Sequence, residues 1–322
     1  MDHAEDDFDG DIFIYRGGQA PQHVTHARID KSVDEIEDLA FDCCRSLAQV
    51  ETHDSLRKVG FGAFRRCNSL RRINLKSAVE IGGYAFYGCA NLESVEFGDR
   101  LETIGIDAFN GCASLKHLKL PSIITIGSGA FYDCKRLTDI ELSERLETIG
   151  ARAFQHSGLQ RIAIPLKRDL FEFSDRFRRC TQFYDCVQLR TIDLVGGIHE
   201  TVSSLHMESW RNEMMAEINS INQVLPYTPA DEKSDEIRQW MELVIDKMDQ
   251  FKAEHCRYVK EGITLLELAL WKAKLGDNED DFEEGITEKA KVDAESARKE
   301  KRITCGAEIV VKHLLPFLQL EE

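Results

Sequence analysis

One short pattern, Phe-x-x-Cys-x-x-Leu, returns along the first two-thirds of this 322-residue chain. Six segments carry it in full: FDCCRSL (41–47), FRRCNSL (64–70), FYGCANL (86–92), FNGCASL (109–115), FYDCKRL (131–137) and FYDCVQL (183–189). A seventh segment, FQHSGL (154–159), is one residue short and lacks the cysteine. From Phe41 to Phe154 successive phenylalanines of the series are 23, 22, 23, 22 and 23 residues apart. This fixed period predicts a leucine-rich solenoid in which each repeat forms one turn.

Each repeat contains two short apolar pieces. Leu-x-x-Ile-x-Leu, as at 115–120 and 137–142, predicts a strand whose alternate residues point inward. A second piece such as Leu101–Ile104 follows a polar turn. A glycine recurs directly after it, where we expect the backbone to turn: Gly60, Gly82, Gly105, Gly127 and Gly150. No repeat can bury its own Phe and Leu, so stacking is expected to bury both, at roughly 1.5–3 kcal/mol for each Phe.

The longer pattern Leu-x-x-Ile-Gly-x-x-Ala-Phe-x-x-Cys-x-x-Leu-x-x-Ile-x-Leu resembles the BspA-like leucine-rich repeats. The resemblance extends from about residue 33 to 165 and again over 183–194. It implies a stacked solenoid, and it suggests adhesion or recognition at a cell surface as one function. The later segments LLELALWKAKLG and ARKEKRITCGAEIVVKHLLPFLQL resemble the tail appended to such repeats in predicted proteins of diatom-like algae.

The sequence therefore predicts an α+β chain in three parts. Residues 1–10 are expected to be a disordered acidic N-terminus, residues 11–199 a solenoid of about seven units, and residues 200–322 an acidic three-helix domain. Terminal turns of a solenoid need covering, and DIFIYRGG (11–18) is expected to cover the N-terminal edge. The interval from Phe154 to Phe183 is longer than the others, which predicts an inserted loop or short helix near 166–180.

After about residue 200 the apolar spacing becomes that of amphipathic helices. The first stripe contains Met207, Trp210, Met214, Ile218, Ile221 and Leu225. A second helix is expected to begin at Pro229 with Thr228 as its N-cap and to extend to about Leu275, either projecting past the solenoid or bending at Gly262. An acidic loop at 276–285 and a third helix from about 287 to 315 would complete an antiparallel bundle.

Charge and composition narrow the possible partners and location. The net charge of −16 opposes nonspecific binding to nucleic acid or to an anionic membrane. No apolar run approaches the ~18 residues of a membrane-spanning helix, so membrane insertion is not expected. The first residues carry six acids and no base, the opposite of a secretory signal, and the ten cysteines favour a reducing cytoplasmic location. The basic run ARKEKR (297–302) leaves a nuclear address open.

Candidate chemistry is sparse, and neither an enzyme nor a bound cofactor is expected. The sequence contains no phosphate-binding loop, nucleophile elbow or paired catalytic motif. The repeat cysteines could form a metal or redox ladder, but metal ligands must converge on one point, whereas repeat positions lie in a line. We therefore favour buried small residues. His23 and His26, with His53 in repeat register, form the other metal-like cluster, and no carboxylate or thiol completes it at diagnostic spacing.

The strand residues between the inward ones are the candidate partner contacts, because solenoids usually bind through this concave surface. The candidates are Arg72, Glu96, His117, Lys119, Asp139, Glu141 and Arg161. Their charge alternates from one repeat to the next, so opposite charges are expected to become neighbours. One interpretation is a self-neutralising ladder of exposed pairs, each contributing a few tenths of a kcal/mol. The other is a docking strip for a partner that itself carries both signs.

Two classes of function remain after this reasoning. The first is an intracellular scaffold that binds one or more protein partners through the solenoid, with the helices acting either as a cap or as a second module. The second is a cell-surface adhesion or recognition protein, which the family resemblance suggests and which requires export. An enzyme is the third and least favoured class.

Overall fold

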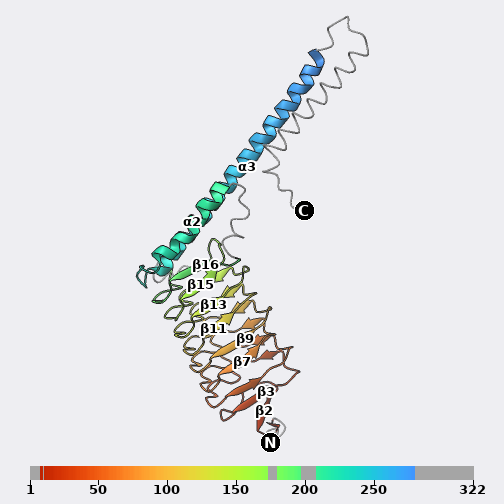
Figure 1. Cartoon of the computed structure of the whole chain (residues 1–322). Coiled ribbons are helices and arrows are strands. Elements are labelled where there is room, and N and C mark those ends of the chain that lie inside the picture. The colour runs from red at the N-terminus through yellow and green to blue at the C-terminus, as the bar shows by residue number, and fades with distance from the viewer. Residues whose placement is uncertain (1–7, 10, 173–179, 197–207, 280–322) are drawn as a thin grey trace. The chain divides into compact units, whose positions relative to one another are not determined.

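The computed structural model describes residues 8–9, 11–172, 180–196 and 208–279 (Figure 1). By internal contacts the chain divides into two compact units. One combines Met1–Thr201 with Met215–Ile245, and the other combines Val202–Met214 with Asp246–Glu322. Several expected features lie outside the described residues: the third helix at 287–315, the run at 297–302, most of the acidic loop, most of the N-terminal tail and the centre of the insertion.

The first unit contains a β-solenoid, as the repeat predicts. One strand per turn forms its first face, and every described pairing on this face is parallel except that of β1 with β2. These strands are β1 (Phe8–Asp9), β2 (Ile12–Tyr15), β3 (His26–Ile29), β5 (Gln49–Glu51), β7 (Arg72–Leu75), β9 (Ser94–Phe97), β11 (His117–Lys119), β13 (Asp139–Glu141), β15 (Arg161–Ile164) and β16 (Thr191–Leu194). We call this side the strand face.

A second parallel sheet forms another side of the stack. Its strands are β4 (Glu35–Ile36), β6 (Lys58–Val59), β8 (Glu80–Ile81), β10 (Thr103–Ile104), β12 (Thr125–Ile126) and β14 (Thr148–Ile149), paired in that order. Each has only two residues, one exposed or half-buried and one fully buried isoleucine or valine. Each of these strands therefore contributes one apolar side chain to the core of the solenoid.

The repeat phenylalanines form a single interior column. Rings of successive turns stack with centroids 5.0–5.6 Å apart and planes within 6–11° of parallel. The column contains Phe41, Phe64, Phe86, Phe109, Phe131, Phe154 and Phe183, all with no exposed surface. At the N-terminal end, Phe13 and Tyr15 of β2 pack on the ring of Phe41. The stacking predicted from the sequence spacing is thus confirmed for all seven phenylalanines.

The recurring glycine after the second strand has a different physical role from the one expected. The expectation was a turn that needs glycine's conformational freedom, but these glycines do not have positive φ angles. Instead, a Cβ built at Gly105 would lie 2.5 Å from the backbone nitrogen of Gly83, and one at Gly150 would lie 2.3 Å from the nitrogen of Ser128. Glycine is required because successive turns touch backbone to backbone.

The left-handed backbone positions lie elsewhere, two residues before and two residues after the repeat phenylalanine. Glycine occupies only some of them, such as Gly111, whose φ is 75°. Others carry a side chain, including Asp133, His156 and Asp185. The chirality of L-residues makes this conformation cost about 1–2 kcal/mol. The stacked turns therefore impose it at both positions in almost every repeat.

These two roles predict different costs of adding a methyl group. We expect Gly105→Ala to lower the free energy of unfolding by about 3 kcal/mol or more, because its new Cβ meets backbone that cannot rotate away. Gly111→Ala is the matched control, expected to cost about 1 kcal/mol for its φ alone, since its nearest neighbour would be 3.6 Å away. Equilibrium denaturation of both variants measures the difference, and equal losses would contradict the close-packing explanation.

The first, described part of the inserted segment packs against the solenoid turn that contains β14. Leu170 and Phe171 are buried, and the backbone of Ile149 in β14 donates to Leu170 at 2.7 Å and accepts from Glu172 at 3.0 Å. Gln182 takes the place of the alanine that precedes the other repeat phenylalanines. Its buried side-chain amide donates to the carbonyls of Ile149 and Glu172, at 3.2 and 2.7 Å. The last turn thus accommodates the insertion with a polar link absent from the regular repeats.

In the described part of the chain after the solenoid there are two helices, α2 (Glu208–Val224) and α3 (Lys233–Glu279). The apolar stripe predicted for the first helix is buried from Trp210 to Leu225, whereas Met207 lies outside the described residues. The two helices are antiparallel: Trp240 donates to the carbonyl of Glu217 at 3.2 Å in the first unit. In the second unit Trp210 stacks on Phe251 at 5.0 Å. Neither described helix has an apolar stretch long enough to cross a membrane.

The second helix differs from its prediction at its start and along its length. It begins at Lys233 rather than Pro229, and the hydroxyl of Thr228 donates to the carbonyl of Val224 at 3.2 Å, so Thr228 serves the end of α2. Pro229 and the next residues form turns. The helix continues without interruption through Gly262 to Glu279. Beyond Phe251 its apolar side chains are largely exposed, Leu265 and Trp271 among them.

The segment 215–245 supplies the hydrogen bonds that a further solenoid turn would supply. The side-chain amide of Asn222 accepts from the backbone nitrogen of Ile192 at 2.8 Å and donates to its carbonyl at 2.9 Å. The hydroxyl of Ser234 accepts from the nitrogen of Phe183 at 2.8 Å, and Asp235 accepts from that of Cys180 at 3.2 Å. We call residues 215–245 the C-terminal cap.

Lys233 is the most buried charged residue of the cap, with 3% of its surface exposed. Its Nζ donates to the carbonyl oxygens of Cys186, Val187 and Leu189, at 3.1, 3.4 and 2.6 Å. Burial lowers the pKa of this amine. One ammonium group therefore satisfies three carbonyls of the final turn, in place of the donors that a following repeat would supply.

Candidate interaction surface

The strand face carries the charge alternation that the sequence predicts. His117 lies in register with Asp139, and Lys119 with Glu141, on neighbouring parallel strands. The Nζ of Lys119 is 2.9 Å from a carboxylate oxygen of Glu141, and this hydrogen bond raises the pKa of Lys119. Both side chains are more than half exposed, so solvent screens the pair and it contributes little to stability.

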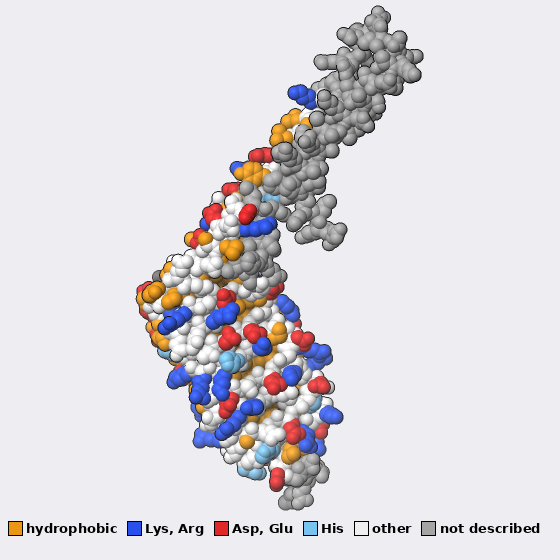
Figure 2. Space-filling view, viewed as in Figure 1, with side chains coloured by type: hydrophobic (Ala, Val, Ile, Leu, Met, Phe, Trp, Pro, Cys, Tyr) orange, Lys and Arg blue, Asp and Glu red, His pale blue; other side chains and the backbone are white. Residues whose placement is uncertain are grey.

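The other candidates also lie on this face, but not all pair with one another. Arg161 pairs with Asp193 of β16, a residue outside the candidate set. Glu96 lies 3.0 Å from the Nζ of Lys76, in the turn after β7. Arg72 is exposed and lies in register with Ser94. The strand face is therefore a row of cross-turn ion pairs, and Figure 2 shows positive and negative side chains interspersed over the solenoid.

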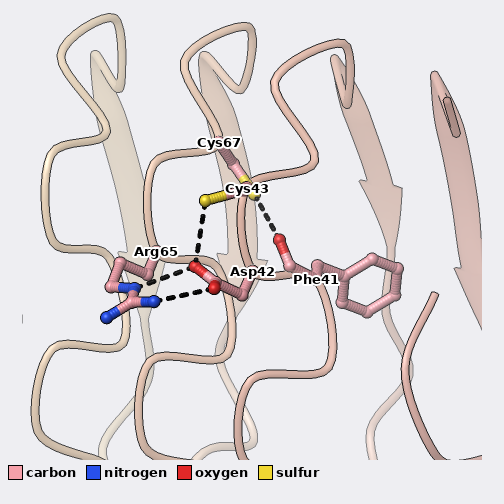
Figure 3. Close-up of polar contacts among 5 residues, drawn as sticks. All are labelled: Phe41, Asp42, Cys43, Arg65 and Cys67. Atoms are coloured by element: carbon pink, nitrogen blue, oxygen red, sulfur yellow. Dashed lines mark hydrogen bonds and ion pairs between the residues drawn. The ribbon is translucent and has the colours of Figure 1, made fainter. Parts of the chain in front are cut away.

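A second set of cross-turn pairs was not predicted. On the second sheet Lys58 lies between Glu35 and Glu80, with its Nζ at 3.1 and 4.0 Å from their carboxylates. In the turns, Arg65 donates two hydrogen bonds of 2.8 Å to Asp42, and these bonds lower the pKa of that carboxyl (Figure 3). The available signal was the spacing of 23 and 22 residues between Glu35, Lys58 and Glu80. Charge pairing is thus a property of the whole stack.

An exposed aromatic cluster was also missed. Phe61 and Ile106 are 46% and 54% exposed and flank Gly83. A Cβ on Gly83 would lie 3.5 Å from the ring of Phe61 and 3.2 Å from the backbone carbonyl oxygen of Ile106. The ring of Phe61 lies 5.3 Å from Tyr84, whose ring lies 5.5 Å from Tyr87. Partly exposed aromatic groups are typical of protein-binding surfaces. The signal in the sequence was aromatic residues at positions that the repeat does not require.

The repeat cysteines are interior hydrogen-bond donors. In five of the six, the Sγ atom lies 2.9–3.3 Å from the phenylalanine carbonyl of the preceding turn, as Figure 3 shows for Cys67 and Phe41. The sixth, Cys44, donates to the carbonyl of Pro21 at 3.7 Å. Burial raises the pKa of Cys89 to about 12 and of Cys186 to about 11, so these thiols keep the proton that they donate. Among the described residues, no three His, Cys, Asp or Glu side chains are grouped so that they could hold a metal ion.

Comparison with known proteins places these repeats in a family. The profile of the BspA type leucine rich repeat region, with six copies, matches residues 20–124, 75–183 and 102–220. No protein of curated function matches the chain. Similar solved structures include a leucine rich repeat protein of T. pallidum, 27% identical with a TM-score of 0.40, covering 56% of this chain and 72% of its own. Another is a leucine rich cell surface protein of Faecalibacterium prausnitzii A2-165, 26% identical with a TM-score of 0.43, covering 57% of this chain and 50% of its own.

The profile matches together span residues 20–220, which is more than half of the chain. They coincide with the stacked phenylalanines, the interior cysteines and the paired short strands described above. On this basis the protein belongs to the BspA-type leucine-rich repeat family.

Proposed function

We propose that the protein is a non-catalytic scaffold that binds a protein partner through the strand face of its solenoid. The observation that carries the proposal is the row of exposed, mixed-charge side chains held in register on rigid parallel strands. Leucine-rich repeat proteins generally mediate protein–protein interaction or surface recognition, which supports a binding role. A partner for this face must itself carry both signs of charge.

We also propose an intracellular location. The nine described cysteines are free thiols, and seven of them are buried. Free thiols in this number are usual in reducing compartments. Recovery of the native protein at the cell surface would instead favour a recognition or adhesion role.

For the helices, we propose that they form a module characteristic of diatom-type algal relatives, as the likeness of LLELALWKAKLG to their tails suggests. The C-terminal cap contributes directly to the solenoid through its hydrogen bonds. The exposed apolar side chains farther along α3 support a second binding role for that helix.

An exchange of charges separates a docking strip from a ladder that is only structural. The double variant Lys119→Glu with Glu141→Lys preserves the ion pair and is expected to leave the unfolding midpoint nearly unchanged, because both side chains are exposed. If the strip docks a partner, we expect the variant to lose most of the partner captured from native lysate at physiological salt. The matched control exchanges Asp42 and Arg65, which pair in the turns away from the strand face, and it should leave capture unchanged.

Quantitative mass spectrometry of the captured proteins gives the result. The absence of any reproducible partner for the full chain would contradict the scaffold proposal. Equal capture by the Lys119/Glu141 exchange and by the unaltered protein would contradict the use of the strand face, and would leave the pairs with a structural role alone.

A further inference from the structure

The shortened repeat, sixth in chain order, creates a pocket in the wall of the solenoid. FQHSGL (154–159) lies between two full-length copies that share the sequence FYDC, at 131–134 and 183–186. A hollow of about 640 Å³ opens at this position, lined by residues of the three turns. Its volume lies within the range of about 300–1,000 Å³ that is usual for ligand pockets. Every lining residue belongs to the first unit and to the described part of the chain.

The missing residue explains the hollow. Up to His156 the short repeat keeps the normal register with both flanking repeats. The nitrogen of Asp133 donates to the carbonyl of Gln155 at 2.9 Å, and that of His156 donates to the carbonyl of Tyr184 at 3.1 Å. The short turn is drawn inward after His156. Gly158 is buried, whereas Lys135 and Val187 at the equivalent positions are exposed, and its nitrogen donates to the carbonyl of Cys134 at 3.2 Å, so the backbone is recessed against the turn before it. The two flanking turns therefore stand out as walls.

The walls present two carboxylates at equivalent positions. Asp133 and Asp185 lie two residues after their phenylalanines, on either side of His156, and all three have left-handed backbone. The Nδ1 of His156 is 3.6 Å from Asp185, and the Nζ of Lys135 is 3.3 Å from Asp133. Both carboxylates are more than a third exposed. A carboxylate has about four acceptor positions, so each can accept further donors from solvent.

An aromatic ring completes the pocket. Tyr132 meets the ring of His156 edge to face at 5.4 Å. Val187 forms an apolar rim and is 67% exposed. An anionic ligand would meet two carboxylates and a single lysine that is already paired. A planar cation could donate to the carboxylates and lie against the aromatic and apolar groups.

We propose that this pocket binds a guanidinium group, the arginine side chain of a partner protein. The inference extends the proposed scaffold function, on which it rests, to a second surface away from the strand face. Arginine fits because its planar fork of donors pairs with carboxylates and also stacks on aromatic rings. The net charge of −16 attracts a basic partner segment over a longer range.

The test uses the full chain and two small probes of nearly the same shape, one with a charged guanidinium and the other with a neutral urea group. N-acetylarginine methylamide is titrated into the protein while the side-chain NMR signals of Tyr132 and His156 are followed. N-acetylcitrulline methylamide, its neutral isostere, is the control. We expect saturable shifts with arginine at millimolar concentration and binding at least about tenfold weaker with citrulline. Asp185→Asn should weaken arginine binding, whereas Lys135→Ala should strengthen it by removing a competing cation.

A repeat-repair variant tests the origin of the pocket. Inserting alanine between Ser157 and Gly158 restores the seven-residue turn, which should fill the hollow and abolish arginine binding. Tyr132→Ala should also reduce binding, while Tyr87→Ala, at the equivalent position of a full-length repeat, should not. If the insertion impairs folding, the Asp185 and Lys135 variants decide the question.

Some outcomes would overturn the proposal. They are equal binding of arginine and citrulline, absence of saturable shifts at Tyr132 and His156, or stronger binding of acetate than of arginine. The scaffold proposal is judged separately by partner capture. A partner that is captured normally by Asp185→Asn, together with a failed arginine titration, would reject the pocket and leave the scaffold in place.

Discussion

Phe109→Ala is expected to lower the free energy of unfolding by about 3–5 kcal/mol. The ring of Phe109 has no exposed surface and is stacked between those of Phe86 and Phe131, at 5.0 and 5.5 Å. Its removal would leave a cavity in the middle of the column, which the neighbouring rings cannot fill without breaking the register of their own turns. Equilibrium unfolding in denaturant measures the loss.

The matched control for this substitution is Phe61→Ala, which removes the same side chain from the surface. Phe61 is 46% exposed and lies outside the column, so its loss is expected to cost less than about 1 kcal/mol. A loss below about 1 kcal/mol at Phe109, or equal losses at both positions, would contradict the interior column as the main source of stability.

Deletion of residues 200–322 is expected to make the remaining fragment aggregate or lose its cooperative unfolding transition. The deletion removes the C-terminal cap and so exposes the last parallel strand, β16, together with the carbonyls that Lys233 satisfies. An uncovered strand edge is a template for pairing with another chain. Solubility, light scattering and thermal unfolding of the fragment measure the effect.

A chain ending at residue 249 is the control, because it retains the cap at 215–245 and should remain soluble and cooperative. The single variant Asn222→Leu removes both hydrogen bonds to Ile192 and is expected to cost about 1–3 kcal/mol by leaving backbone groups unsatisfied. If the fragment without residues 200–322 unfolds as cooperatively as the longer chain, the helices are a separate module rather than a cap.

The periodic part of the fold could be predicted from the sequence because the spacing itself carries the information. The phenylalanine column and the opposite charges of Lys119 and Glu141 both follow from placing equivalent residues on adjacent turns. The role of the recurrent glycine could not be predicted in the same way. Glycine is selected both where the backbone needs a positive φ and where two backbones approach closely. The φ angle of Gly105 and its close approach to Gly83 distinguish the two requirements.

The cap and the pocket depend on residues outside the periodicity. Lys233 and Asn222 bond to backbone groups 30 to 47 residues earlier in the chain, and no repeat relates them to their partners. The sequence therefore left open whether the helices act as a cap. The shortened repeat was visible as a gap in the pattern, but a gap does not say whether the chain closes over it. The burial of Gly158, at a position where Lys135 and Val187 of the flanking repeats are exposed, shows that it recedes.

Spin-label distances along the strand face test the stacked solenoid most directly. Labels would be placed on cysteines introduced at the pairs Gln49/Arg161, His26/Arg161 and His26/Thr191, with Cys43, Cys256 and Cys305 replaced by serine. These pairs are separated by five, six and seven repeats, so distances near about 24, 29 and 34 Å are expected at about 4.8 Å per turn. Distances that fail to increase by a constant step with each added repeat would contradict the solenoid.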